Sequence, residues 1–145
     1  MTDAIPNLWP KKFSRGILTP LAVLRVQAAK FKDMTEGLLE AEVTTNWERE
    51  DLKVHSLELI APALDSYRRV ILTVRHAHPG AYPLWLRSDF LSGSVEDYDE
   101  DNPSGECGSQ EELFSALRQV FASRELSTLV ESLIAQINDA EAVPA

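Results

Sequence analysis

Two histidines one residue apart, His76 and His78, have the types and spacing best suited to chemistry in this chain, and Asp89 follows eleven residues later. Strand side chains repeat every two residues, so a His-x-His pair at a strand end directs both imidazoles to one side. Zn²⁺ binds two imidazoles and a carboxylate, and it keeps its fourth position for water in a hydrolytic site. The spacing therefore indicates a zinc site built on His76, His78 and Asp89.

These residues resemble the motif of the JAMM metalloproteases, in which H-x-H is followed by ten residues and an aspartate. Pro79 matches a common follower of the second histidine, and Glu36 in "TEGLLEAEV" lies where that family has its general base. The resemblance implies a zinc-dependent hydrolase with Glu36 as base. Two features depart from the family: Leu86 replaces the serine three residues before the aspartate, and the chain after Asp89 becomes an acidic loop and then helix.

The alternative interpretation of the two histidines is structural. His76 shares the phase of Leu72 and Val74, so it would end a core-facing strand, with His78 beginning a loop and Asp89 ending the next strand. A motif defines a site only in its structural context, and here the serine and the following strands are missing. We therefore expect a non-catalytic protein rather than an enzyme, with the zinc hydrolase as the alternative.

A helix must precede the strands that would position these groups. Thr19 followed by Pro20 predicts its start, because a hydroxyl caps the first turn and proline suits the first helical position. Gly37 predicts its end, because glycine accepts the left-handed conformation that terminates helices. The apolar stripe of this helix recurs at steps of three and four, at Leu21, Leu24, Ala28 and Phe31.

Four strands are expected after this helix, because the apolar pattern changes to a period of two. They cover residues 38–45, 52–60, 67–76 and 82–88, with turns at "NWERED" and "APALD". The third strand is predicted to place Val70, Leu72 and Val74 on one face, and Arg69, Ile71, Thr73 and Arg75 on the other. Pro83 lacks a backbone donor and favours an edge position for the fourth strand. Short connections favour an antiparallel meander.

The last third of the chain is predicted to be a loop and then helical. Residues 92–108 form a loop with six acidic residues, and Ser109 with Glu112 forms the S-x-x-E pattern of a capping box. Residues 109–138 then carry helical apolar stripes that fit either one bent helix or two helices. Residues 139–145 are expected to fray.

The chain is thus predicted to be one α+β domain over residues 1–145. It comprises an N-terminal helix, a four-stranded antiparallel meander sheet, and a C-terminal helix or helix pair packed on one face. Residues 1–18 form an irregular arm, in which Pro6 and Pro10 bracket Leu8 and Trp9. We expect Trp9 to attach the arm to the body, because an indole ring is better buried than exposed to water.

Charge and composition limit the partners and the compartment. The net charge is −9, and residues 76–145 carry 3 basic and 13 acidic side chains. Nucleic acid is therefore excluded as a partner, while a basic protein surface is favoured. The single cysteine, Cys107, excludes an internal disulfide and agrees with a reducing compartment. No apolar run approaches the roughly 20 residues that span a bilayer, and no signal peptide is recognisable, so we expect a cytoplasmic protein.

The fourth predicted strand supplies the candidate binding residues Tyr82, Trp85 and Arg87. Trp85 and Arg87 share a phase opposite to that of Tyr82, so they would lie on the sheet face that the helices leave open. Aromatic side chains beside cations are typical of interface hot spots. We expect this face, rather than the helices, to bind another protein, as an adaptor, an immunity-type inhibitor or a chaperone would.

Overall fold

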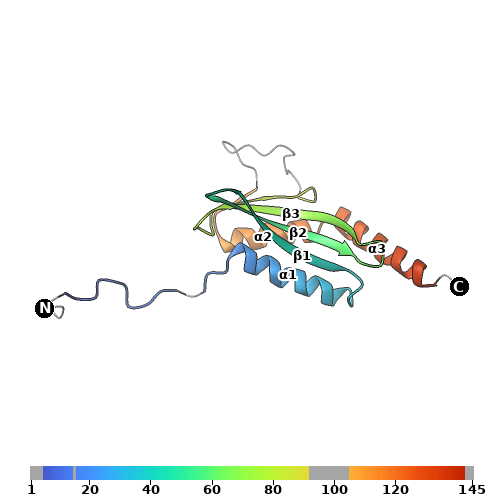
Figure 1. The fold of residues 1–145 in the computed structure, drawn as a ribbon, viewed down its shortest axis with the longest axis horizontal. Helices are drawn as coiled ribbons and strands as arrows, with labels where there is room; N and C mark the ends of the chain where they lie inside the picture. Colours follow the sequence, from blue (N-terminus) through green and yellow to red (C-terminus); the bar gives the residue numbers. More distant parts are fainter. Residues whose placement is uncertain (1–4, 15, 92–104, 143–145) are drawn as a thin grey trace.

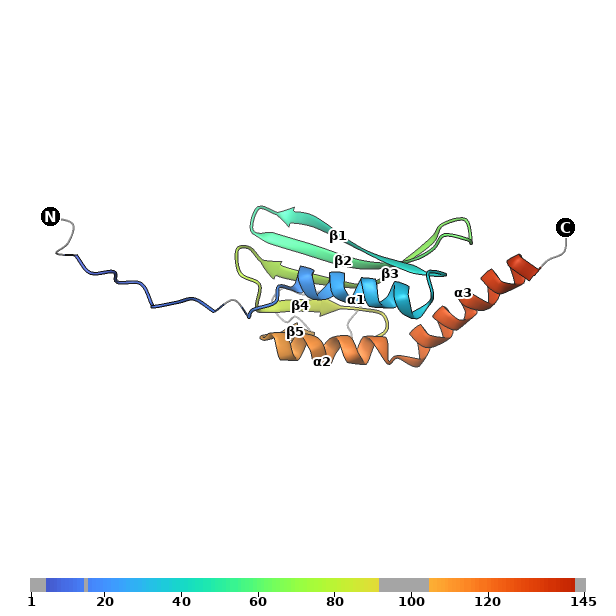
Figure 2. The same cartoon turned by 90° about the horizontal axis from the view of Figure 1, so that it is seen from below.

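The computed structural model describes residues 5–14, 16–91 and 105–142. Its elements, in chain order, are α1 (Pro20–Met34), β1 (Glu40–Arg49), β2 (Leu52–Ala61), β3 (Tyr67–Ala77), β4 (Leu84–Arg87), β5 (Glu106–Cys107), α2 (Gln110–Phe121) and α3 (Arg124–Ala142). The strands form one antiparallel sheet in the order β1-β2-β3-β4-β5. Helices α1 and α2 lie on the same face of this sheet (Figures 1 and 2). The predicted α+β fold is confirmed, with a short fifth strand added.

Helix α1 begins and ends at the residues that the sequence indicated. The side-chain oxygen of Thr19 accepts a hydrogen bond from the backbone N–H of Ala22, and Pro20 occupies the first turn. At the other end Gly37 has φ +80° and donates its N–H to the carbonyl of Lys32. Between these caps, the face of α1 toward the sheet buries Pro20, Val23, Leu24 and Ala28.

Strand β1 is longer than predicted, and the expected turn at "NWERED" is wrong for its first four residues. The ladder with β2 continues through the pairs Thr45–His55 and Trp47–Lys53 before an irregularity near Arg49. Backbone pairing along a ten-residue partner therefore outweighed the local turn preference of asparagine. The turn itself is confined to residues 50–51.

A bulge in β3 overturns the predicted division of its two faces. Leu57 of β2 pairs with Leu72, but the next residue pairs with Val70, so Ile71 has no partner of its own. A bulge directs both Ile71 and Leu72 to the helix-covered face, where both are buried. Val70 is consequently exposed on the other face, and Arg69, which pairs with Leu59, does not join the open face.

Strand β4 is not the edge strand that Pro83 suggested, because β5 pairs with it on the far side. Two residues of the stretch predicted as an acidic loop, Glu106 and Cys107, form this short strand, and the carbonyl of Gly105 accepts the N–H of Leu86. That part of the loop prediction is therefore wrong. Residues 92–104 of the loop lie outside the described residues.

The C-terminal region consists of two helices, which settles the alternative left open by the sequence. Ser109 caps α2 by accepting the N–H of Glu112, and the Glu112 carboxylate accepts the N–H of Gly108. Ser123 separates the helices, and its hydroxyl oxygen accepts the N–H of Leu126 at 3.4 Å. Helix α3 continues to Ala142, so the predicted fraying is not observed for residues 139–142, and residues 143–145 lie outside the described residues. Burial of Ile137, which is 1% exposed, holds this part of the helix in place.

The N-terminal arm runs away from the body instead of packing on it (Figures 1 and 2). The predicted attachment through Trp9 is wrong: this side chain is 73% exposed, and its ring contacts the ring of Phe13. The arm is held at its other end, next to α1. There the Tyr82 hydroxyl donates to the carbonyl of Leu18, and the N–H of Leu18 donates to the side-chain carbonyl of Gln110.

Candidate functional site

The histidine that leads the zinc motif is paired with a different histidine. The Nε2 atoms of His55 and His76 lie 2.9 Å apart, and both side chains are buried on the helix-covered face. His76 Nδ1 lies 2.6 Å from the carbonyl oxygen of Gly80, and His55 Nδ1 lies 2.8 Å from the hydroxyl of Thr45. A carbonyl only accepts, so His76 donates from Nδ1 and accepts at Nε2 from His55. The hydroxyl of Thr45 then donates to His55.

This chain of three hydrogen bonds uses every ring nitrogen of the pair. Burial, together with smaller electrostatic contributions from His76, Lys53 and Arg25, lowers the pKa of His55 to about 4. His55 is therefore neutral at pH 7. The pair links β1, β2 and β3 to the connection before β4, and neither ring has a nitrogen free to bind a metal or to accept a substrate proton.

The structure does not bring the other residues of the zinc hypothesis to His76. His78 is exposed and its ring stacks edge-on against Trp47, with centroids 5.0 Å apart. Asp89 is exposed near Arg69, and Glu36 is exposed beyond the end of α1. Across residues 5–14, 16–91 and 105–142, no three His, Cys, Asp or Glu side chains are grouped so as to hold a metal ion. This geometry gives the zinc-hydrolase alternative no support.

Cys107 also lacks the features of a reactive group. Its side chain is buried, and this burial, together with smaller contributions from the carboxylates of Glu112 and Glu106, raises the pKa of the thiol to about 11. A thiolate is the nucleophilic form of cysteine, so this thiol is unreactive at neutral pH.

The three predicted binding residues do not form one site. Tyr82 is half-buried and its hydroxyl holds the arm through Leu18. Trp85 and Arg87 are half-buried on the sheet face away from the helices, in register with Arg75 and Thr73. The indole nitrogen of Trp85 is buried without a hydrogen-bond partner among the described residues.

The open face of the sheet is otherwise rich in ion pairs. Arg68 contacts Glu42 at 2.6 Å and Glu58 at 2.8 Å, and Arg75 contacts Glu48 at 2.9 Å. Pairs of this kind satisfy charges within the chain and leave a polar surface. They do not form the apolar centre that protein interfaces usually have.

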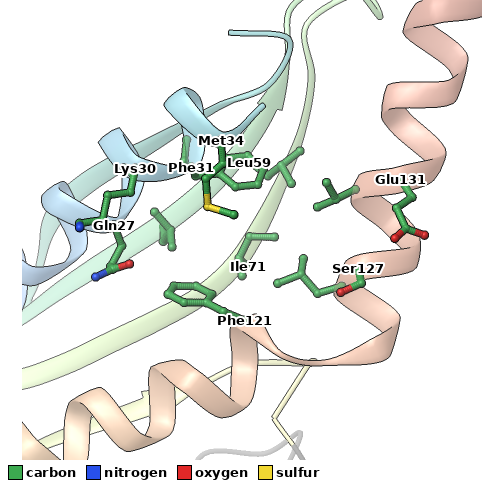
Figure 3. A pocket seen from close by; sticks show the side chains of 14 residues that line it. Gln27, Lys30, Phe31, Met34, Leu59, Ile71, Phe121, Ser127 and Glu131 are labelled. Carbon is green, nitrogen blue, oxygen red and sulfur yellow. The ribbon is translucent and has the colours of Figure 1, made fainter. Parts of the chain in front are cut away.

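The sequence did not predict an apolar groove that opens on the helix-covered face. It lies between α1 on one side and the end of α2 and first half of α3 on the other, with strands β1 to β3 as its floor (Figure 3). Its volume is about 290 Å³. The lining residues are Gln27, Ala28, Lys30, Phe31, Met34, Ala41, Leu57, Leu59, Ile71, Phe121, Leu126, Ser127, Val130 and Glu131.

The groove exists because α3 does not continue the path of α2. The chain turns at residues 122–123, and α3 runs beyond α1 towards the end of the sheet at which β2 joins β3 (Figure 2). The bulge in β3 contributes directly, because it turns Ile71 into the floor.

One feature of the sequence pointed to this groove. Helix α3 carries one broad apolar stripe, in which Leu126, Leu133 and Ile137 are buried in the core while Leu129, Val130 and Ile134 are only partly buried against it. Leu126 and Val130 line the groove. The partly buried Val130 therefore contributes apolar surface that faces the groove.

The polar residues of the groove lie at its rim. Gln27 and Lys30 come from α1, and Ser127 and Glu131 come from α3 (Figure 3). The floor carries aliphatic side chains from the strands and no titratable group. An apolar centre with a polar rim is the composition of a protein-binding site.

We found no match for this chain among protein-family models, curated proteins or solved structures. The functional conclusion therefore depends on the geometry of the groove.

Proposed function

We propose that this chain is a non-catalytic protein-binding domain that holds an apolar segment of a partner protein in the groove between α1 and α3. The observation that carries the proposal is the groove itself, about 290 Å³ in volume, with Leu57, Leu59 and Ile71 as its floor. Two helices form its walls, and such grooves bind amphipathic segments through two or three apolar anchors. A small-molecule site would need polar groups converging on the ligand, whereas here they lie at the rim.

Charged residues at the rim of the groove favour one orientation of the bound partner segment. Lys30 lies on the α1 side of the rim, and Glu131 lies on the α3 side. A segment with basic side chains toward α3 is favoured, because complementary charge selects partners and speeds encounter. The acidic balance of residues 76–145 supports the same choice of a basic partner.

Adaptors, immunity-type inhibitors and chaperones all act through such interfaces, and the proposal covers these classes. A cytoplasmic location fits the single, buried cysteine of the chain. Within the described ranges, no helix combines the length and the apolar character needed to cross a membrane.

The groove replaces the open sheet face as the favoured interface. The sequence predicted binding through Trp85 and Arg87 rather than through the helices, but Phe31 of α1 and Val130 of α3 offer apolar surface at the groove. Binding through Trp85 and Arg87 stays a prediction. Tyr82 serves the arm instead.

Selection from a displayed peptide library, followed by fluorescence anisotropy, tests the proposal. Peptides selected on the full chain are expected to bind Val130→Asp at least about tenfold more weakly, because an unpaired carboxylate in an apolar groove costs more than about 1.4 kcal/mol. Ala41→Leu, which fills the groove from its floor without adding a charge, should have the same effect.

Thr128→Asp is the matched control, because Thr128 is exposed on the same helix and does not line the groove. It should bind the selected peptides like the parent chain. Peptides that bind the parent and both groove variants equally would show that this groove is not the binding site.

A further inference from the structure

The N-terminal arm carries large apolar side chains into solvent. Leu8 is 84% exposed, Trp9 is 73% exposed and Phe13 is 63% exposed. Exposed apolar side chains that are grouped within six residues are typical of an interaction surface. The arm thus supplies unburied anchors, while the groove supplies unfilled apolar space.

The arm also matches the charge of the groove. Lys11 and Lys12 lie between Trp9 and Phe13, and α3 presents the carboxylate of Glu131 at the rim of the groove. An arm segment in the groove would thus bury aromatic rings and pair its ammonium groups with α3. Pro6 and Pro10 restrict the arm before it binds, which reduces the entropy lost on docking.

The path of the arm favours the groove of another molecule. Both backbone groups of Leu18 are hydrogen-bonded, to Tyr82 and to Gln110, and from there the arm runs away from α1 (Figures 1 and 2). The groove begins near Gln27, which lies about 10 Å from Pro20 along α1, in the opposite direction. To fill its own groove, the chain would have to reverse beside this fixed point.

We propose that the arm of a second copy of this chain occupies the groove, and that the exchange is reciprocal in a two-fold symmetric dimer. The proposal rests on the proposed function, because it assigns an occupant to the same groove. Exchange of an identical segment is a low-cost route to a dimer, since each molecule supplies the contact that it receives. A bound arm also covers the groove until a protein partner displaces it.

Sedimentation equilibrium of the full chain over a range of concentrations tests this proposal. The parent chain is expected to dimerise, while Trp9→Ser and Val130→Asp should each raise the dimer dissociation constant at least about tenfold, as loss of an interface anchor does. Trp9 is exposed in the single molecule, so its replacement leaves the fold intact.

Charge reversal shows whether the arm and α3 meet. Glu131→Lys should weaken the dimer, and the triple variant Lys11→Glu, Lys12→Glu, Glu131→Lys should recover affinity relative to Glu131→Lys alone. Thr128→Lys, on an exposed position of α3 outside the groove, is the control and should dimerise like the parent. Failure of the triple variant to recover would overturn the pairing of the arm with α3.

Mixing two defective chains separates exchange from self-occupation. Trp9→Ser keeps its groove and Val130→Asp keeps its arm, so an equimolar mixture should form heterodimers through one intact contact. A parent chain that stays monomeric at every concentration, or a dimer that persists in both variants, would overturn arm exchange. In the monomeric case, groove-dependent peptide binding would still support the proposed function. Conversely, the chain could form a dimer that requires Trp9 and Val130 while no selected peptide binds the groove. That result would support arm exchange and contradict the proposed function.

Discussion

Replacing Gly105 by alanine is expected to destabilise the protein by about 3 kcal/mol, because the new side chain meets the backbone of a neighbouring strand. A Cβ atom at Gly105 would lie 2.2 Å from the carbonyl oxygen of Leu86, and φ at this position is +80°. Gly105 also accepts the N–H of Leu86, so any displacement breaks the hydrogen bond that joins β5 to β4. Denaturant unfolding measures the loss directly.

Gly37→Ala provides the matched control for this prediction. Gly37 has the same φ of +80°, but a Cβ atom there meets open space. Its replacement should lower the free energy of unfolding by about 1 kcal/mol, which is the cost of placing alanine in the left-handed conformation. Equal losses in the two variants would show that β5 does not approach β4 as closely as the structure describes.

Lowering the pH from 7 to 4 is expected to reduce the free energy of unfolding by about 3 kcal/mol through the protonation of His55 alone. The folded pKa of His55, about 4, lies below the ordinary value of 6.5, so the unfolded chain takes up the proton first. The contribution is complete above pH 6.5 and is lost as the pH falls toward 4. If both His55 and His76 were protonated, two N–H groups would face each other across 2.9 Å.

Unfolding of His55→Leu across the same pH range isolates this contribution from that of the carboxylates. The difference in unfolding free energy between the parent and this variant should shrink as the pH falls. His76→Leu at pH 7 should cost about 2 kcal/mol, because His55 loses its acceptor, and His55→Leu with His76→Leu should cost less than the sum of the single changes. Parallel pH profiles for the parent and His55→Leu would contradict the described pair.

The elements that local chemistry specifies could be predicted from the sequence. Thr19 and Gly37 mark α1 because caps are local signals, and the meander follows from alternation and short turns. The bulge at Ile71 could not be predicted, since Val70, Ile71 and Leu72 are all apolar and only pairing with β2 decides which of them has no partner.

The candidate site could not be predicted from local sequence patterns, because it depends on contacts between distant parts of the chain. No spacing rule joins His55 to His76, which meet because β2 and β3 pair in one register. The groove depends on the direction that α3 takes after Ser123, and Ser123 alone does not specify an angle between helices. The breadth of the apolar stripe on α3, which includes Val130, is the one local sign of this groove.

NMR of the full chain, labelled at methyl groups and at indole nitrogens, locates a selected peptide on the protein. If the peptide lies in the groove, the methyl signals of Leu57, Ile71 and Val130, which line it, are expected to shift, while the indole N–H signal of Trp85 on the opposite face stays unchanged. Shifts at the Trp85 indole with unmoved groove methyls would instead place the binding surface on the open face of the sheet and overturn the proposed function.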